Sequence, residues 1–128
     1  MSDRETSRGD ENSGLRKDPV LGVEKVGESC LVRLGGELDL YNAQDVRRAL
    51  TDACGDSPQR IVVDLGEVEF IDSTALGVLI ESRSKMTNGR AFLLAAPGLE
   101  TRRALKISGL DRHFAVHDTV SAALDADV

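Results

Sequence analysis

Residues 61–65, Ile-Val-Val-Asp-Leu, are the feature that most constrains the fold of this 128-residue chain. Most of these residues are apolar and β-branched, and turn-forming residues stand on both sides of the run. Such a short, non-alternating run is typical of a strand that is buried on both faces of a parallel sheet. Residues 91–95, Ala-Phe-Leu-Leu-Ala, form a second run of this kind. The two runs therefore predict a sheet that is at least partly parallel.

Segments with helical periodicity alternate with these strand-like runs. The first helix is expected to start at Asn42, whose side chain can cap it, and to stop at Gly55. The second should begin near Asp72 or Ser73 and end near Asn88-Gly89, with these residues facing inward: Ala75, Leu76, Leu79, Ile80 and Met86. Two further helices are expected between Gly98 and Gly109 and from Asp118 or Thr119 through Leu124.

The remaining strands are expected at residues 20–26, 30–34, 68–71 and 114–116, with a loop at residues 66–67. Because strands and helices alternate after the first hairpin, the pattern predicts an α/β sandwich. We expect a mixed sheet of four to five strands with about four helices packed on it. Residues 1–18 are rich in charged and small polar residues, so we expect a disordered N-terminal tail and one domain at residues 19–128.

The composition restricts the classes of partner. The net charge is −6 and aromatic residues make up only 3% of the chain, so direct binding to nucleic acid or to anionic membranes is not expected. No apolar stretch is long enough to cross a bilayer or to act as a signal peptide, which predicts a cytoplasmic protein. In that reducing compartment Cys30 and Cys54 are interpreted as small apolar side chains rather than as a disulfide.

The segment Asp72-Ser73-Thr74 is the candidate site, because three small polar residues stand where a strand-like segment runs into a helix. In the simplest interpretation one of them caps the helix by accepting a backbone N–H of its first turn. That interpretation does not require two adjacent hydroxyls. A phosphoserine is also tolerated at a helix start, where free N–H groups and the helix dipole favour an anion. Phosphorylation beside Asp72 and Glu69 would then block an interface without refolding the chain.

Five stretches in order resemble the anti-sigma-factor antagonists, the single-domain bacterial proteins of the STAS fold. The matching residues are 36–43 (Gly-Glu-Leu-Asp-Leu-Tyr-Asn-Ala), 61–65, 68–77 (Val-Glu-Phe-Ile-Asp-Ser-Thr-Ala-Leu-Gly), 108–111 and 116–119. One such stretch would be a weak signal, but five in this order and spacing are specific.

The resemblance implies a switch that binds a protein partner and is not an enzyme. The unphosphorylated form would bind an anti-sigma factor that is a serine kinase of the histidine-kinase-like ATPase class, and this binding would release a sigma factor. The kinase would phosphorylate Ser73, with Thr74 as the alternative acceptor, and a phosphatase would reset the switch. The partner-binding residues implied are Asp39, Tyr41, Asn42, Asp72, Ser73, Thr74, Ala75 and Leu76. No cofactor is implied. The family usually has Gly where this chain has Ala75, whose methyl group favours helix and is expected to add bulk where the partner approaches.

Two enzymatic interpretations have little support in the sequence. Ser73 lacks the Gly-x-Ser-x-Gly context of a hydrolase nucleophile, and the only histidines, His113 and His117, lie far along the chain. These histidines would share one face of a strand, yet no carboxylate cluster completes a metal site, so surface positions are expected. A second function class stays open, in which the chain is a non-switching STAS subunit of a lipid-transport complex or of a signalling scaffold.

Overall fold

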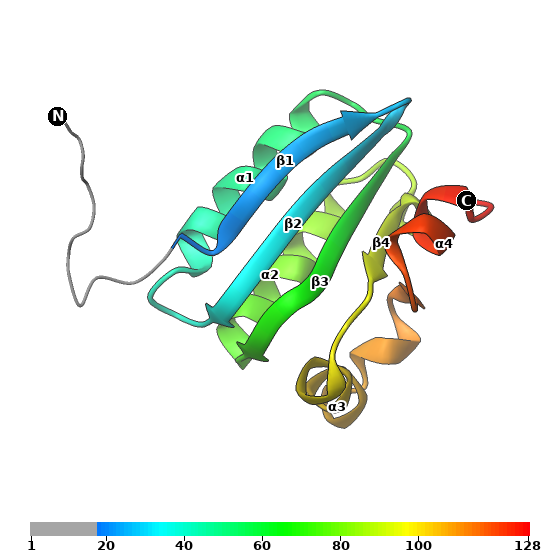
Figure 1. The fold of residues 1–128 in the computed structure, drawn as a ribbon. Coiled ribbons are helices and arrows are strands. Elements are labelled where there is room, and N and C mark those ends of the chain that lie inside the picture. The colour runs from blue at the N-terminus through cyan, green and yellow to red at the C-terminus, as the bar shows by residue number, and fades with distance from the viewer. Residues whose placement is uncertain (1–17) are drawn as a thin grey trace, which may run out of the picture.

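The computed structural model describes residues 18–128, which form one five-stranded sheet with helices on both faces. The predicted tail at residues 1–18 lies, apart from Asp18, outside the described residues. The strands are β1 (Val20–Val26), β2 (Ser29–Leu38), β3 (Arg60–Ile71), β4 (Phe92–Ala95) and β5 (Ala115–His117). The helices are α1 (Ala43–Gly55), α2 (Ser73–Ser84), α3 (Leu99–Ser108) and α4 (Val120–Asp125), with short 3₁₀ turns at Gly89–Ala91 and Leu110–Arg112. The α/β sandwich with a mixed sheet is therefore confirmed (Figure 1).

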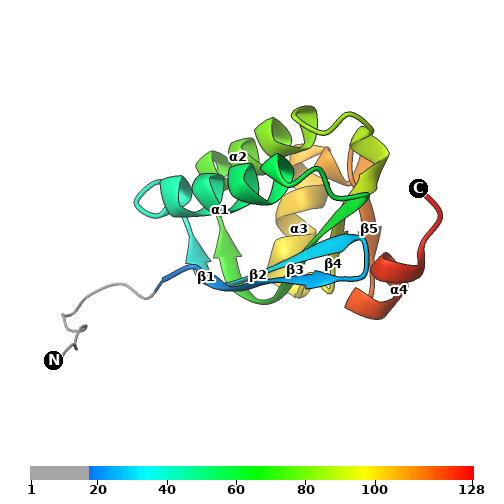
Figure 2. The same ribbon diagram turned by 90° about the horizontal axis from the view of Figure 1, so that it is seen from above.

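The order of the strands in the sheet follows their order in the sequence. β1 pairs antiparallel with β2, whereas β2, β3, β4 and β5 are mutually parallel. Figure 2 shows α1 and α2 on one side of the sheet and α4 on the other. The core on the first side contains most of the buried apolar residues, including side chains of α1, α2 and α3. The smaller core on the α4 side contains Val62, Leu93 and Ala123. Because adjacent residues of β3 enter the two cores, this strand lacks the alternation of a half-exposed strand, as its sequence predicted.

The predicted break at residues 66–67 is wrong, because β3 continues without interruption to Ile71. Its pairing with β2 shifts register between Arg33 and Gly35 and again between Gly36 and Glu37. The sheet therefore absorbs Gly66 and Glu67 as an irregularity of a long strand, where the local sequence alone suggested a loop. β2 is also longer than expected and reaches Leu38.

The helices were predicted better at their starts than along their faces. Asp72 caps α2, Gly109 ends α3 in the left-handed conformation (φ 78°), and Thr119 caps α4, all as expected. However, α2 ends at Ser84 rather than near residue 88, and Ile80 is exposed where an inward position was expected. Val78 and Ser82 are buried instead, because the face centred on Leu79 packs on the sheet.

Two smaller expectations need correction at the C-terminal half. Ala91 belongs to the 3₁₀ turn that precedes β4, and the last strand starts at Ala115, one residue later than predicted. Phe114 precedes this strand and packs on Phe92 with ring centroids 6.0 Å apart. No helix between residues 18 and 128 has the length and apolar character that crossing a membrane requires.

Candidate functional site

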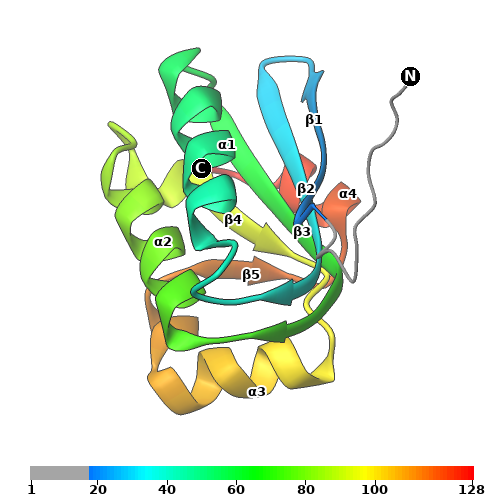
Figure 3. The same cartoon turned by 90° about the vertical axis from the view of Figure 1, so that its left-hand side faces the viewer.

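The predicted site lies where β2 and β3 end, at the edge of the sheet that is formed by the carboxyl ends of its parallel strands. These strands are parallel and Leu38 is the register partner of Ile71, so the residues that follow both strands meet at the same edge. The loop at residues 39–42 follows β2, and Asp72 follows β3 and leads directly into α2. Figure 3 shows this edge above α3, with the start of α2 beside it. Two motifs that are distant in the sequence therefore form one surface.

The carboxylate of Asp72 connects these two segments. Its Oδ1 accepts a hydrogen bond from the backbone N–H of Ala75 at 3.0 Å, which caps α2. Its Oδ2 accepts one from the backbone N–H of Leu40 at 3.2 Å, from a residue 32 positions away in the sequence. The backbone N–H of Asp72 donates in turn to the carbonyl of Leu38 at 3.0 Å. The expected cap is thus also a bridge between the start of α2 and the loop after β2.

Asn42 stabilises the same loop from within. Its Oδ1 accepts from the backbone N–H of Asp39 at 2.9 Å, and its Nδ2 donates to the carbonyl of Glu37 at 2.7 Å. The Asp39 carboxylate accepts from the backbone N–H of Tyr41 at 3.0 Å. The prediction that the Asn42 side chain caps α1 is therefore wrong, although Asn42 does occupy the residue before the helix. A buried amide needs partners for both its donor and its acceptor, and the end of β2 supplies both.

The phosphoacceptor candidates lie on the outside of this junction. Ser73 and Thr74 are exposed in the first turn of α2. The next two residues turn inward, and the side chain of Ala75 is only 1% exposed while that of Leu76 is also buried. The expectation that the Ala75 methyl group adds bulk at a partner surface is thus wrong, because this methyl group packs in the core. Any contribution of Ala75 and Leu76 to binding would come from holding the helix start in place.

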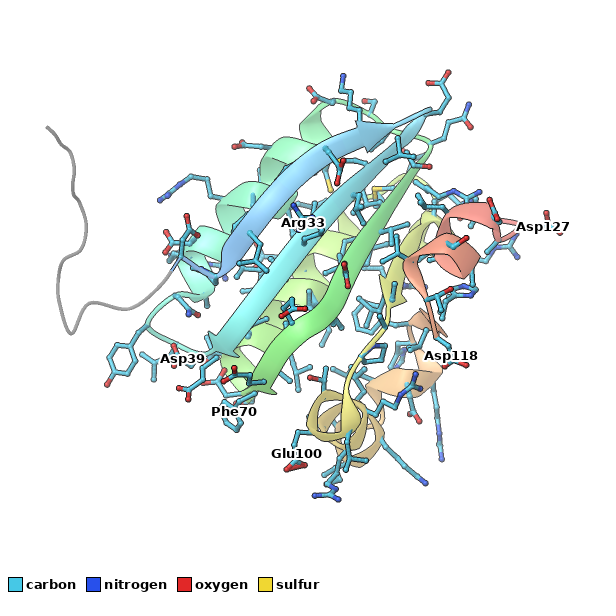
Figure 4. All side chains as sticks on the ribbon, in the orientation of Figure 1. Arg33, Asp39, Phe70, Glu100, Asp118 and Asp127 are labelled. Atoms are coloured by element: carbon cyan, nitrogen blue, oxygen red, sulfur yellow. The ribbon has the colours of Figure 1, made fainter. Side chains whose placement is uncertain are left out.

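Three large apolar side chains are exposed in the segments that meet at this junction. Leu40 is 61% exposed, Tyr41 76% and Phe70 51%. Figure 4 shows the side chain of Phe70 next to Asp39 at the tip of the sheet. The sequence indicated Tyr41 but missed Leu40 and Phe70, because exposure of an apolar residue at a strand end has no local signal. Exposed apolar residues that gather in this way are characteristic of protein-binding surfaces.

The charge of this surface is negative. Residues 34–46 and 61–82 contain no Lys or Arg. They contribute four carboxylates around the junction, from Glu37, Asp39, Glu69 and Asp72. A further negative charge placed on Ser73 would therefore join an acidic environment, as the sequence suggested.

The histidines do not form a metal centre with other residues of the described chain. His113 lies just after the second 3₁₀ turn and is exposed, and only His117 lies in β5, so the prediction that they share a strand face is wrong. Among residues 18–128 no three side chains of His, Cys, Asp and Glu are grouped as a metal site requires. Cys30 and Cys54 are free thiols, the first buried as expected and the second only half-buried. Burial raises the pKa of both thiols above the ordinary value.

Comparison with known proteins identifies the family to which this chain is similar. A profile of the STAS domain matches residues 21–123. The anti-sigma-F factor antagonist RsfB of Mycobacterium tuberculosis is 34% identical over 95 residues, which are 74% of this chain and 78% of that protein. The anti-sigma-B factor antagonist of Staphylococcus aureus is 30% identical over 80 residues, 62% of this chain and 74% of the relative.

A solved structure agrees with these relatives. The crystal structure of an anti-sigma factor antagonist from Mycobacterium paratuberculosis superposes with a TM-score of 0.75 at 33% identity, covering 80% of this chain and 87% of that one. The match to the family profile spans most of the chain and includes β1 through α4. The chain therefore belongs to the STAS domain family.

Proposed function

We propose that this chain is an anti-sigma-factor antagonist whose binding is switched off by phosphorylation of Ser73. In its unphosphorylated form it binds an anti-sigma factor and thereby releases a sigma factor. The observation that carries the proposal is the exposed Ser73 at the start of α2, directly after Asp72, whose carboxylate binds the loop that carries the exposed side chains of Leu40 and Tyr41. The anti-sigma-factor antagonists among the relatives support the antagonist role.

The exposed apolar residues explain why a phosphate would prevent binding. A partner that packs on Leu40, Tyr41 and Phe70 must exclude water from the surface next to Ser73. A phosphoserine carries about −1.5 to −2 charges at neutral pH, so its burial in such an interface would be costly. The nearby Asp72 carboxylate adds electrostatic repulsion. Phosphorylation therefore acts on the interface and leaves the apolar core unchanged.

The fold itself tolerates the modification. The helix start offers backbone N–H groups and the positive end of the helix dipole, both of which stabilise an anion. Ser73 is exposed, so a phosphate there does not displace packed side chains. This combination of tolerance in the free state and disruption in the complex is what a reversible switch requires.

The partners follow from the family. The anti-sigma factor would be a serine kinase with a histidine-kinase-like ATPase fold that uses ATP to phosphorylate Ser73, or Thr74 as the alternative acceptor. A phosphatase would restore the active form. The chain itself acts by binding and needs no cofactor, and its place of action would be the cytoplasm. The partner-binding set proposed from the sequence is Asp39, Tyr41, Asn42, Asp72, Ser73, Thr74, Ala75 and Leu76, to which we add Leu40 and Phe70.

Phosphorylation is tested with the cognate anti-sigma factor and ATP, followed by intact mass spectrometry. Wild type and Thr74→Ala should each gain one phosphate, whereas Ser73→Ala should gain none. Thr74→Ala is a matched control because Thr74 is also an exposed hydroxyl in the same helical turn. A Ser73→Ala protein that is phosphorylated as fully as wild type would contradict the assignment of the acceptor.

Binding is tested by calorimetry with the same partner in the absence of ATP. Ser73→Ala should bind as tightly as the unphosphorylated wild type. Ser73→Glu should bind at least about tenfold more weakly, which corresponds to about 1.4 kcal/mol. Equal affinities for Ser73→Ala and Ser73→Glu would argue against a charge-controlled interface and favour a non-switching STAS module.

A further inference from the structure

A groove runs along the free edge of the sheet, between β1 and α1. β1 is the first strand of the sheet, and among residues 18–128 no strand pairs with its outer edge. The groove has a volume of about 800 Å³, which lies within the range of roughly 300–1,000 Å³ that is usual for binding sites. Figure 3 shows β1 at the edge of the sheet with α1 beside it.

The groove has an apolar floor and an open strand as one wall. Val23 of β1 is 50% exposed, although it lies within the strand, and the buried side chains of Cys30 and Ala53 form part of the base. The other wall is a single stripe of α1 that continues to Asp56 directly after the helix, because its lining residues recur three or four positions apart. These residues are Asp45, Arg48, Ala49, Asp52, Ala53 and Asp56.

The charges along the groove are predominantly negative. Five carboxylates and only two cations, Lys25 and Arg48, line it. Arg48 is engaged by Asp45 at 3.5 Å. By contrast, neither Asp52 nor Asp56 makes an ion pair within residues 18–128. Within the described part of the chain, the groove therefore offers two carboxylates without an ion-pair partner beside an apolar floor.

The geometry points to a docking site for an extended, basic segment of a partner protein, which adds as a strand to the outer edge of β1. An edge strand presents backbone N–H and C=O groups to which another strand can bind. The aliphatic stems of Lys or Arg would cover Val23 and Ala49, and their charged ends would reach Asp52 and Asp56. This site goes beyond the proposed switch, although Tyr41 and Asn42 at one end of the groove also belong to the proposed partner-binding set.

The length of the segment is set by the register of β1. The pairing of β1 with β2 is irregular between Val20 and Gly22 and regular from Gly22 to Val26. An added strand would therefore pair with residues 22–26. A small cation would fill part of the groove but would leave the strand edge unpaired, so a peptide fits the whole site better.

The test uses the ¹⁵N-labelled full chain and the peptide acetyl-Lys-Thr-Val-Thr-Lys-amide in an NMR titration. We expect the amide signals of residues 22–26 and of the α1 stripe to shift together. The double variant Asp52→Asn/Asp56→Asn should bind about fourfold more weakly, at about twofold for each exposed ion pair lost. The matched variant Asp111→Asn/Asp125→Asn removes two exposed carboxylates elsewhere on the chain and should bind as wild type does. If both double variants weaken peptide binding equally, the effect comes from the net charge of the chain alone, and the proposal is overturned.

Backbone methylation of the peptide separates strand addition from simple charge attraction. In an added strand only alternate residues direct their N–H groups toward β1. N-methylation of one alternate set should therefore abolish binding, while methylation of the other set should be tolerated. Binding that survives both modifications would exclude a β-strand at this edge. Binding that is lost in Ser73→Glu would place the peptide at the switch surface instead and would equally overturn the assignment to the groove.

Discussion

The substitution Asp72→Asn separates the two hydrogen bonds that the Asp72 carboxylate makes. Asn keeps one side-chain oxygen, which can still accept from Ala75, and Asn is as good a helix cap as Asp. Its other terminal atom becomes an NH₂ group, which is a donor and cannot accept from the N–H of Leu40. The variant therefore detaches Leu40 from the start of α2, while α2 stays capped and the bonds of Asn42 within the loop remain.

The expected loss of stability is about 1–2 kcal/mol. Removing a negative charge from the first turn of a helix costs about 0.3–1 kcal/mol. Losing the bond to Leu40 costs about 1 kcal/mol, which is less than is usual for a charged acceptor, because this contact is exposed and water can replace it. Urea denaturation followed by circular dichroism measures the sum, with an unchanged dependence on urea concentration if the core stays intact.

Hydrogen exchange measures the local effect of Asp72→Asn on the hydrogen bond between Leu40 and residue 72. The amide of Leu40 should exchange about fivefold faster in Asp72→Asn, whereas the amide of Ala75 should change much less. Thr119→Ala is the control, because it removes the cap of α4, where Thr119 accepts from Ala122 at 3.0 Å, and costs about 1 kcal/mol without touching the site. An unchanged exchange rate at Leu40 in Asp72→Asn, or an equal increase in Thr119→Ala, would refute the bridge.

Three further predictions concern Ala75, Glu81 and the two cysteines. Ala75→Gly should destabilise the chain by about 1–2 kcal/mol in urea denaturation, because it removes a buried methyl group and adds backbone freedom to α2, and a gain in stability would contradict the core position of Ala75. The hydrogen bond from Arg47 lowers the pKa of Glu81, so Glu81→Gln should destabilise near neutral pH. A carboxylate whose pKa is lowered by folding stabilises the folded chain above its unfolded pKa of 4.5. The difference in stability between wild type and Glu81→Gln should therefore disappear as the pH falls through the folded pKa of Glu81. A difference that stays constant with pH would exclude the ion pair as its cause. The thiols of Cys30 and Cys54 should react slowly with Ellman's reagent at pH 7.5 and rapidly in urea, since burial raises the pKa of both, and fast reaction in the native state would show that they are more accessible than described.

The sequence predicted those features that depend on residues close to one another along the chain. The apolar run at residues 61–65 identified the central strand, because burial on both faces selects β-branched apolar residues over the whole run. Gly109 ended α3, because a left-handed residue there is sterically easiest for Gly. Asp72 and Thr119 were found as helix caps for a similar local reason.

The features that the sequence did not predict depend on pairing across the sheet. β3 continues through Gly66 and Glu67 because β2 runs beside it, and no local signal reports a neighbouring strand. The sequence predicts that Asn42 caps α1, because Asn42 directly precedes the helix. Its side chain instead bonds the backbone of Glu37 and Asp39, at and just after the end of β2. The bond from Leu40 to Asp72 is of the same kind, since it joins the segments that follow two neighbouring strands.

The parallel pairing of β2 and β3 explains why two distant motifs serve one surface. Parallel strands end at the same edge of a sheet, so whatever follows β2 must lie beside whatever follows β3. Topology brings the segments together, but it does not hold an exposed loop in one conformation. Asp72 supplies that constraint, because one of its oxygens fixes the start of α2 and the other fixes Leu40. Asp72 thus holds Leu40 beside the start of α2, where the proposed acceptor Ser73 lies, so residue 72 is the position at which geometry and partner binding can be tested apart from phosphorylation.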